Sequence, residues 1–261
     1  MNRIRQAGFR VKNVLALGLF NFATYQEGAW MKILSINVST GREVSYMGKT
    51  VRTGIFKQPV KGRVMLRSLN LDGDAQSDLL NHGGIYKAAY VYPVENYGFW
   101  KRELQREDFT FGQFGENLTV QGMLEDDVSI GDIFRVGNAK VEVTQPRVPC
   151  YKLGIRMGRP EFPKMFLASG RVGFMLRVLG EGELEAGDSF ERLKAGPEQI
   201  TVRKINHLLY FDPENLDEAR VALRIPALSP GWRGSFEKRL AEARRRIENQ
   251  KKPSDGRCCG P

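Results

Sequence analysis

The stretch from Ile133 to Leu153, IFRVGNAKVEVTQPRVPCYKL, decides the fold. It opens with two strand-like runs joined by Gly137-Asn138, a pair that supplies the positive φ of a two-residue hairpin turn. The second run, residues 139–144, alternates apolar and polar side chains, as a strand with one buried face does. The stretch therefore predicts a β-hairpin that leads directly into a proline-containing segment with one cysteine.

The residues on both sides of this hairpin continue the strand-and-turn pattern. Further strand-like runs lie at 31–38, 62–69, 88–92 and 118–120, and two helical patterns lie at 94–105 and 161–168. Many short strands with few helices favour a sheet that closes, or nearly closes, on itself. We therefore expect a mainly β fold with some α, built as a β-barrel with a few peripheral helices.

The hydrophobic period changes after residue 197. Apolar spacing from Ile200 to Leu209 suits a helix, and Asp212-Pro213 and Ser229-Pro230 are start signals for two more. The chain thus divides into an N-terminal extension at 1–30, a β domain at 31–197, a three-helix module at 198–245 and a basic tail at 246–261.

Composition and charge exclude several classes of protein. The formal net charge is +10, but residues 1–30 carry four cations against one acid and residues 244–261 carry six against two. A basic excess concentrated in the ends is typical of solvated tails, so we expect no nucleic-acid-binding core. The three cysteines exclude a disulfide framework, and the two histidines leave little room for a His-rich zinc site.

The first thirty residues contain a short apolar run, residues 14–20, behind a basic stretch. This order is similar to a secretory signal, but residues 21–23 lack the small residues of a cleavage site. Met31 then opens a strand-like run. We therefore expect an extension that is poorly ordered, and a cytoplasmic protein.

The cysteine segment is the most informative for function. Pro146 and Pro149 stiffen the backbone around Cys150, and Arg147 and Lys152 flank the thiol. Nearby cations favour the thiolate, which is the form that attacks or binds a metal. The alternative is a buried structural cysteine, which is the usual role of a single cysteine.

Three other segments contain candidate ligand-binding residues. In the stretch NHGGIYK, Gly83 and Gly84 allow close approach by an anionic ligand, while His82 and Lys87 add a proton donor and a cation. Gly115-Glu116-Asn117 precedes a strand, where polar side chains can face a cleft. Residues 56–60, FKQPV, form a cationic turn, for which the alternative is a solvated hairpin.

These segments together resemble a MOSC-domain protein of the YiiM type, from Met31 through Leu240. The resemblance rests on the His-Gly-Gly and cysteine segments together with Gly115–Leu118. Residues 208–210 and 226–232 are similar to the three-helix module that follows the barrel in this family.

The resemblance implies binding of the molybdenum cofactor. Cys150 would be the thiolate ligand of molybdenum and a catalytic residue, and His82 would be the catalytic acid. The implied cofactor-binding residues are Lys87, Gly83, Gly84, Asn117, Arg147 and Lys152.

The implied activity is reduction of N-hydroxylated bases and amines. The sequence contains no cysteine set for an iron–sulfur cluster and no dinucleotide fingerprint, so the resemblance implies an external flavoprotein reductase as electron donor. Two alternatives stay open. One is a non-catalytic carrier of the cofactor or of sulfur on Cys150, and the other is a nucleic-acid binder that uses the basic tails.

Overall fold

The computed structural model describes residues 31–75 and 83–251, so the predicted extension at 1–30 and the predicted acid His82 lie outside the described residues. The strands are β1 Lys32–Val38, β2 Arg42–Tyr46, β3 Lys49–Thr53, β4 Gln58–Val60, β5 Val64–Leu66, β6 Ala89–Pro93, β7 Leu118–Gln121, β8 Ile133–Val136, β9 Ala139–Pro146, β10 Phe174–Gly180, β11 Gly182–Leu184 and β12 Phe190–Lys194. The helices are the short 3₁₀ helix η1 Ile85–Lys87, α2 Glu95–Leu104, α3 Tyr151–Met157, α4 Phe162–Ala168, α5 Val202–Tyr210, α6 Leu216–Leu223 and α7 Pro230–Lys251.

The predicted hairpin is confirmed as β8 and β9. Val136 stands opposite Ala139, and Gly137 has a φ of 51° at the turn. A Cβ atom at Gly137 would lie 2.4 Å from the carbonyl oxygen of Glu183, so this position requires glycine for its conformation and for its space. β9 also pairs with β10 and ends at Pro146, four residues before Cys150, so the hairpin fixes where the cysteine segment begins.

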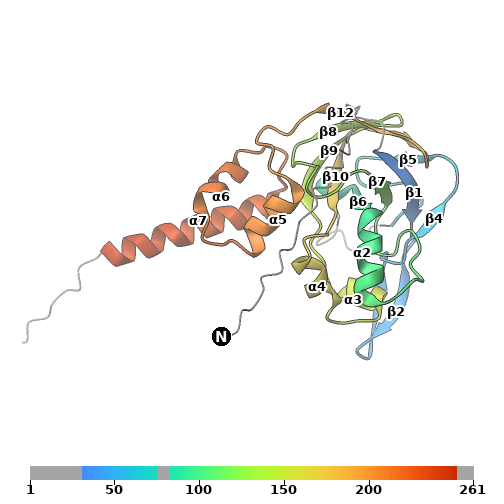
Figure 1. Ribbon diagram of the computed structural model, residues 1–261, viewed down its shortest axis with the longest axis horizontal. Helices are drawn as coiled ribbons and strands as arrows, with labels where there is room; N and C mark the ends of the chain where they lie inside the picture. The colour runs from blue at the N-terminus through green and yellow to red at the C-terminus, as the bar shows by residue number, and fades with distance from the viewer. Residues whose placement is uncertain (1–30, 76–82, 252–261) are drawn as a thin grey trace, which may run out of the picture.

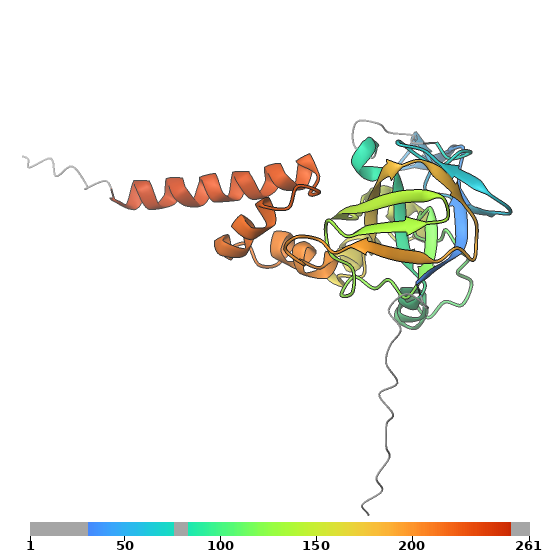
Figure 2. The same ribbon diagram turned by 90° about the horizontal axis from the view of Figure 1, so that it is seen from above.

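The main sheet has eight strands in the order β12-β8-β9-β10-β6-β7-β1-β4, and only β6 and β7 run parallel. The mainly β class with α is confirmed. The sheet is not fully closed as a barrel, because β12 and β4 are the two ends of the strand order. In Figure 2 the strands curl around a common centre, with the helical module to one side.

The pairing of β1 explains why the sheet is not closed, because β4 and β12 meet the same edge of this strand. Residues 36–38 pair with β4, so only the start of the strand reaches β12. There the amide of Phe190 donates to the carbonyl of Met31 over 2.8 Å, and the amide of Ile33 donates to the carbonyl of Asp188 over 2.9 Å.

A second, aromatic core lies between β6 and the helices α2, α3 and α4, at the lower end of the sheet in Figure 1. Trp100 and Phe166 stack at 5.7 Å between ring centroids, and the indole of Trp100 donates to the hydroxyl of Tyr92 over 2.7 Å. Both predicted helices of this region are confirmed as α2 and α4, whereas α3 was not predicted.

The three-helix module follows the sheet, as the change of period indicated. Trp232 and Phe236 are buried and Leu240 packs against the main core, so these three residues, spaced four apart, form the buried face of α7. The second helix start was predicted wrongly at Asp212-Pro213. α6 begins after Asn215, whose side chain accepts from the amide of Glu218, while the carboxylate of Asp212 accepts from the Asn215 amide group.

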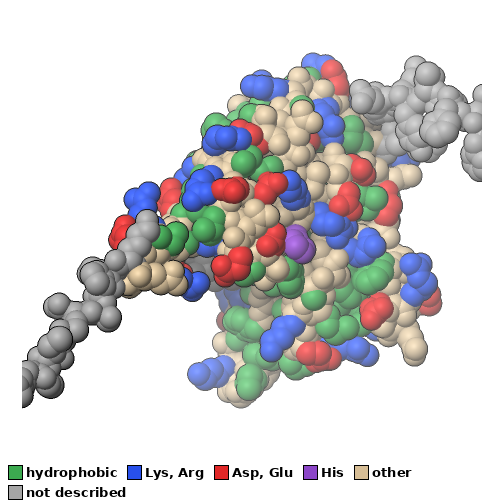
Figure 3. All heavy atoms as spheres, turned by 60° about the vertical axis from the view of Figure 1, so that its left-hand side comes forward, with side chains coloured by type: hydrophobic (Ala, Val, Ile, Leu, Met, Phe, Trp, Pro, Cys, Tyr) green, Lys and Arg blue, Asp and Glu red, His purple; other side chains and the backbone are tan. Residues whose placement is uncertain are grey.

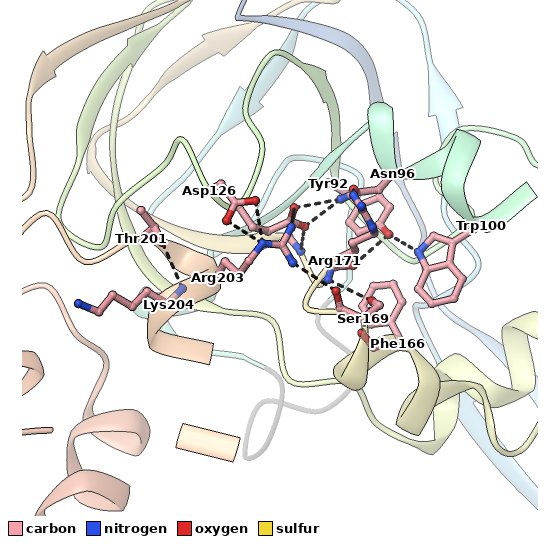
Figure 4. Close-up of polar contacts among 12 residues, drawn as sticks. Tyr92, Asn96, Trp100, Asp126, Phe166, Ser169, Arg171, Thr201, Arg203 and Lys204 are labelled. Carbon is pink, nitrogen blue, oxygen red and sulfur yellow. Dashed lines mark hydrogen bonds and ion pairs between the residues drawn. The ribbon is translucent and has the colours of Figure 1, made fainter. Parts of the chain in front are cut away.

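Arg203 on α5 attaches the module to the sheet domain (Figure 4). Its Nε lies 2.7 Å from both carboxylate oxygens of Asp126, and its Nη1 donates to the carbonyl of Ser169 over 3.2 Å. Val202 and Ile205 of the same helix are buried in the main core together with sheet residues. The module is therefore packed against the sheet.

Within the described parts of the chain, none of the helices is both long and apolar enough to cross a membrane.

Candidate functional site

A cavity of about 750 Å³ lies where the ends of several sheet strands meet the helical module. Its lining comes from the loops after β3 and β5, the η1 segment, the starts of β6 and β7, the segment that follows β9, and the module residues Leu209, Tyr210, Trp232 and Ser235. Segments far apart in the sequence therefore meet around one space.

All the predicted site residues that the structure describes line this cavity: Gly83, Gly84, Lys87, Asn117, Arg147, Cys150 and Lys152. The fold thus brings together three segments that the sequence could only single out separately. His82 lies outside the described residues, and its neighbour Gly83 is part of the lining. The roles of these residues stay predictions.

Cys150 stands at the junction of the cysteine segment and α3. Its backbone is extended, with φ −124° and ψ 174°, and its carbonyl accepts from the amide of Leu153 over 2.9 Å. The side chain is half-buried and makes no capping hydrogen bond to α3. The spacing of Leu153 and Met157, followed by Gly158 as C-cap, was the sequence signal for this unpredicted helix.

The glycine segment is tied to the cysteine segment by β9. Thr144 on β9 donates from its hydroxyl to the carbonyl of Tyr86 over 2.7 Å, which holds η1 and its Lys87 beside the strand that leads to Cys150. Gly84 has a φ of 95°, and a Cβ atom there would meet nothing within 4 Å. Glycine is needed here for conformation, and the space beside the backbone is open to a ligand.

Arg147 contributes a buried donor that nothing in the described chain satisfies. The residue is only 7% exposed, and its guanidinium carbon lies 4.8 Å from the ring centroid of Tyr90 and 5.5 Å from that of Phe166. Its Nη1 has no hydrogen-bond partner among the described residues. A buried charged group without an acceptor is costly, so this atom indicates an anionic or polar ligand in the cavity.

The burial of Lys57 excludes a solvated turn at residues 56–60, which was one of the two interpretations of this candidate segment. The residue is 7% exposed, lines the cavity, and its Nζ donates to both carboxylate oxygens of Asp74 over 2.6 and 2.7 Å. Burial lowers the pKa of the Lys57 amine, and the Asp74 carboxylate opposes that shift. The sequence singled out Lys57 as part of a candidate segment, but it did not identify Asp74.

Asn117 positions Asp74. Its amide nitrogen donates to Asp74 over 2.9 Å, and its carbonyl oxygen accepts from the amide of Tyr90 over 3.1 Å. The amide of Ser39 donates to the other carboxylate oxygen of Asp74 over 2.8 Å. Lys57 and Asp74 are therefore held by β1, β6 and β7 together.

Glu116 lies beneath the cavity and does not face it. It is fully buried and accepts from the amides of Gly112 and Phe114 over 2.9 and 3.0 Å, and from the hydroxyls of Thr119 and Tyr97. Burial raises the pKa of this carboxyl group. Its hydrogen bonds shape the turn that presents Asn117.

The described lining carries an excess of positive charge, from Lys57, Lys87, Arg147 and Lys152, against the single acid Asp74. A cleft lined with one sign of charge attracts ligands of the other sign. On the face shown in Figure 3, Lys and Arg alternate with acids and apolar side chains. That face therefore presents no uniform basic stripe of the kind that a nucleic acid follows.

Comparison with known proteins identifies the class. The MOSC domain matches residues 78–191, and the YiiM-like 3-alpha helix domain matches residues 200–243. The chain belongs to the MOSC-domain family, and within it to the YiiM-like proteins that carry the 3-alpha helix domain. The resemblance drawn from the sequence is thereby confirmed.

Several relatives are similar over most of their length. The chain is 44% identical to the uncharacterized protein YflK of Bacillus subtilis over 79% of this chain and 93% of YflK, and 35% identical to protein YiiM of Escherichia coli over 78% and 91%. The crystal structure of YiiM from Geobacillus stearothermophilus superposes with a TM-score of 0.69 at 38% identity, covering 80% of this chain and 99% of that one. A protein of Gibberella moniliformis named reductase is 32% identical over 61% of this chain and 29% of its own length.

Proposed function

We propose that this protein is a molybdenum-cofactor-dependent reductase of N-hydroxylated bases and amines. The observation that carries the proposal is the cavity itself: the cysteine, glycine and Asn117 segments converge on it, and Arg147 offers it a buried donor without an acceptor. The MOSC domain and the relative named reductase support the same class of chemistry.

The residues present fit the cofactor. A thiolate from Cys150 suits a soft, redox-active metal, and cations around the same cavity suit a phosphate group. Arg147, Lys87 and Lys152 would hold the phosphate, and the backbone at Gly83-Gly84 would allow its close approach. When bound, the group would supply a redox-active molybdenum centre for the two-electron reduction of an N–OH group.

The chain's own residues place and enclose the substrate. The start of α3 fixes Cys150, and Tyr210 and Trp232 of the helical module, 5.9 Å apart between ring centroids, form an apolar part of the wall. His82 remains the proposed acid, since its neighbour Gly83 lines the same cavity.

The reduction consumes two electrons, which we assign to an external flavoprotein reductase. The relative named reductase is much longer than its matched segment, which is consistent with a MOSC unit that works beside other modules. We place the protein in the cytoplasm, where reduced nicotinamide is available to such a donor.

The test is reduction of an N-hydroxylated amine by wild-type protein made in a cofactor-competent host, with Cys150→Ser and the exposed control Lys61→Arg beside it. Wild type and control should turn over substrate, and Cys150→Ser should be inactive with an unchanged melting temperature. Near-normal turnover by Cys150→Ser would contradict the ligand role. Labile sulfur on Cys150 without metal would instead indicate a sulfur carrier.

A further inference from the structure

Lys57 lies in the candidate segment at residues 56–60, but the proposed function gives it no role. It lies on the loop between β3 and β4, it lines the cavity, and the described chain buries it almost completely. Lys87 and Lys152 also line the cavity, but they are only half-buried. A lysine is seldom buried unless it is paired, and here its partner is Asp74.

The geometry of this pair leaves one proton available. An ammonium group has three N–H bonds, and Asp74 accepts at 2.6 and 2.7 Å through its two oxygens. Lys57 has no further acceptor among the residues that the structure describes. The amine is thus oriented by a carboxylate and still has a donor for a ligand in the cavity.

The surrounding charges also favour proton release. Burial lowers the pKa of the Lys57 amine, and the positive charge of Arg147 acts in the same direction. The negative charges of Asp74 and Glu116 oppose the shift without cancelling it. An amine whose pKa moves toward neutrality is a better general acid at physiological pH than an ordinary lysine.

We propose that Lys57 donates a proton to the substrate during reduction, with Asp74 as the residue that orients it. The inference rests on the proposed function. In the reaction R–NHOH + 2 e⁻ + 2 H⁺ → R–NH₂ + H₂O, the N–O bond breaks and the flavoprotein reductase supplies both electrons. Lys57 gives one of the two protons to the nitrogen that becomes the amine, and solvent then returns a proton to Lys57.

Two measurements test this without relying on turnover alone. In lysine-labelled protein without cofactor, an NMR titration should show the Lys57 amine with a pKa below those of the exposed lysines, and Asp74→Asn should lower it further because a negative charge is lost. Molybdenum and pterin content should be unchanged in Lys57→Arg, since the positive charge remains.

Measurements of kcat and KM then separate proton donation by Lys57 from the effect of its positive charge. A guanidinium group stays protonated in proteins, so Lys57→Arg should lower kcat at least about 100-fold with KM nearly unchanged, which is the usual contribution of a general acid. It should also remove the limb of the pH–kcat profile that follows the Lys57 pKa. Lys61→Arg, the same exchange at an exposed position four residues away, should match wild type.

The outcomes separate the two proposals. An active wild type with normal turnover in Lys57→Arg, or an ordinary pKa for Lys57, would overturn the inference and leave the proposed function intact. Loss of molybdenum and pterin from Lys57→Arg would make the residue a cofactor contact and would also overturn it. A wild type that holds cofactor but never reduces N-hydroxylated compounds would overturn both.

Discussion

Replacing Arg147 by methionine should change stability and binding in opposite directions. The Arg147 side chain is buried against Tyr90 and Phe166, and its Nη1 finds no acceptor among the described residues. An unsatisfied buried donor costs about 1–3 kcal/mol, whereas the contacts with the two rings contribute about 0.5–2 kcal/mol. Methionine removes both and fills much of the same volume, so the free energy of unfolding of the cofactor-free variant should differ from wild type by between about −1 and +2.5 kcal/mol, with the middle of that range in favour of the variant.

Binding should fall in the same variant. A charge-assisted hydrogen bond contributes about 1.5–3 kcal/mol, which corresponds to roughly a 10- to 150-fold loss of affinity for the cofactor. The assay is urea unfolding of the cofactor-free protein, paired with molybdenum and pterin content after expression in a competent host. Arg42→Met is the matched control, because Arg42 lies 3.5 Å from the ring centroid of Phe56 but does not line the cavity.

The reasoning would be refuted if Arg147→Met lost about 3–5 kcal/mol of stability, the cost of breaking a buried ion pair, and kept its full cofactor content. The variant has a second readout. Since the charge of Arg147 lowers the pKa of Lys57, that pKa should rise in Arg147→Met.

Three further predictions follow from the described contacts. Cys150→Ser should lose molybdenum and all turnover while its melting temperature stays within a degree or two of wild type, because serine is nearly isosteric but a poor ligand for a soft metal; bound molybdenum in this variant would contradict the ligand role. Lys87→Ala should weaken cofactor retention by about 1.5–3 kcal/mol if its ammonium meets the phosphate, as measured by cofactor loss on dilution, and unchanged retention would remove it from the site. Glu125 is fully buried and accepts hydrogen bonds from the side-chain amide of Asn96 and the backbone amide of Gly173. Burial raises the pKa of Glu125 above 4.5, so the folded state holds this proton more tightly and stability should fall as pH rises past 4.5. Glu125→Gln should remove up to about 1.4 kcal/mol per pH unit of that fall, and an identical pH profile of urea unfolding would contradict it.

The local elements of the fold could be predicted because their signals are local. Alternation at 139–144 and the Gly-Asn turn specified β8 and β9 without any knowledge of the rest of the chain. The prediction of the second helix start was wrong because two local signals competed. Asp212-Pro213 and Asn215 are both capping sequences. The helix begins after Asn215, whose side chain caps it, while Asp212 accepts a hydrogen bond from the Asn215 side chain instead of capping.

The site could be predicted only as separate segments. Cys150 and Arg147 stand out by their own neighbours, but the pairing of Lys57 with Asp74 depends on loops brought together by the sheet. Asn117 reaches Asp74 from 43 residues away, because β7 lies beside β1. A lysine in a short polar turn gives no sequence signal for such a partner, so its burial required the three-dimensional arrangement.

Molybdenum and pterin content per chain, in wild-type protein purified from a cofactor-competent host, tests the central claim most directly. The account predicts molybdenum and pterin in equal amounts in wild type and in Lys61→Arg, and no molybdenum in Cys150→Ser. Wild-type protein without either component, or with labile sulfur in place of metal, would contradict it.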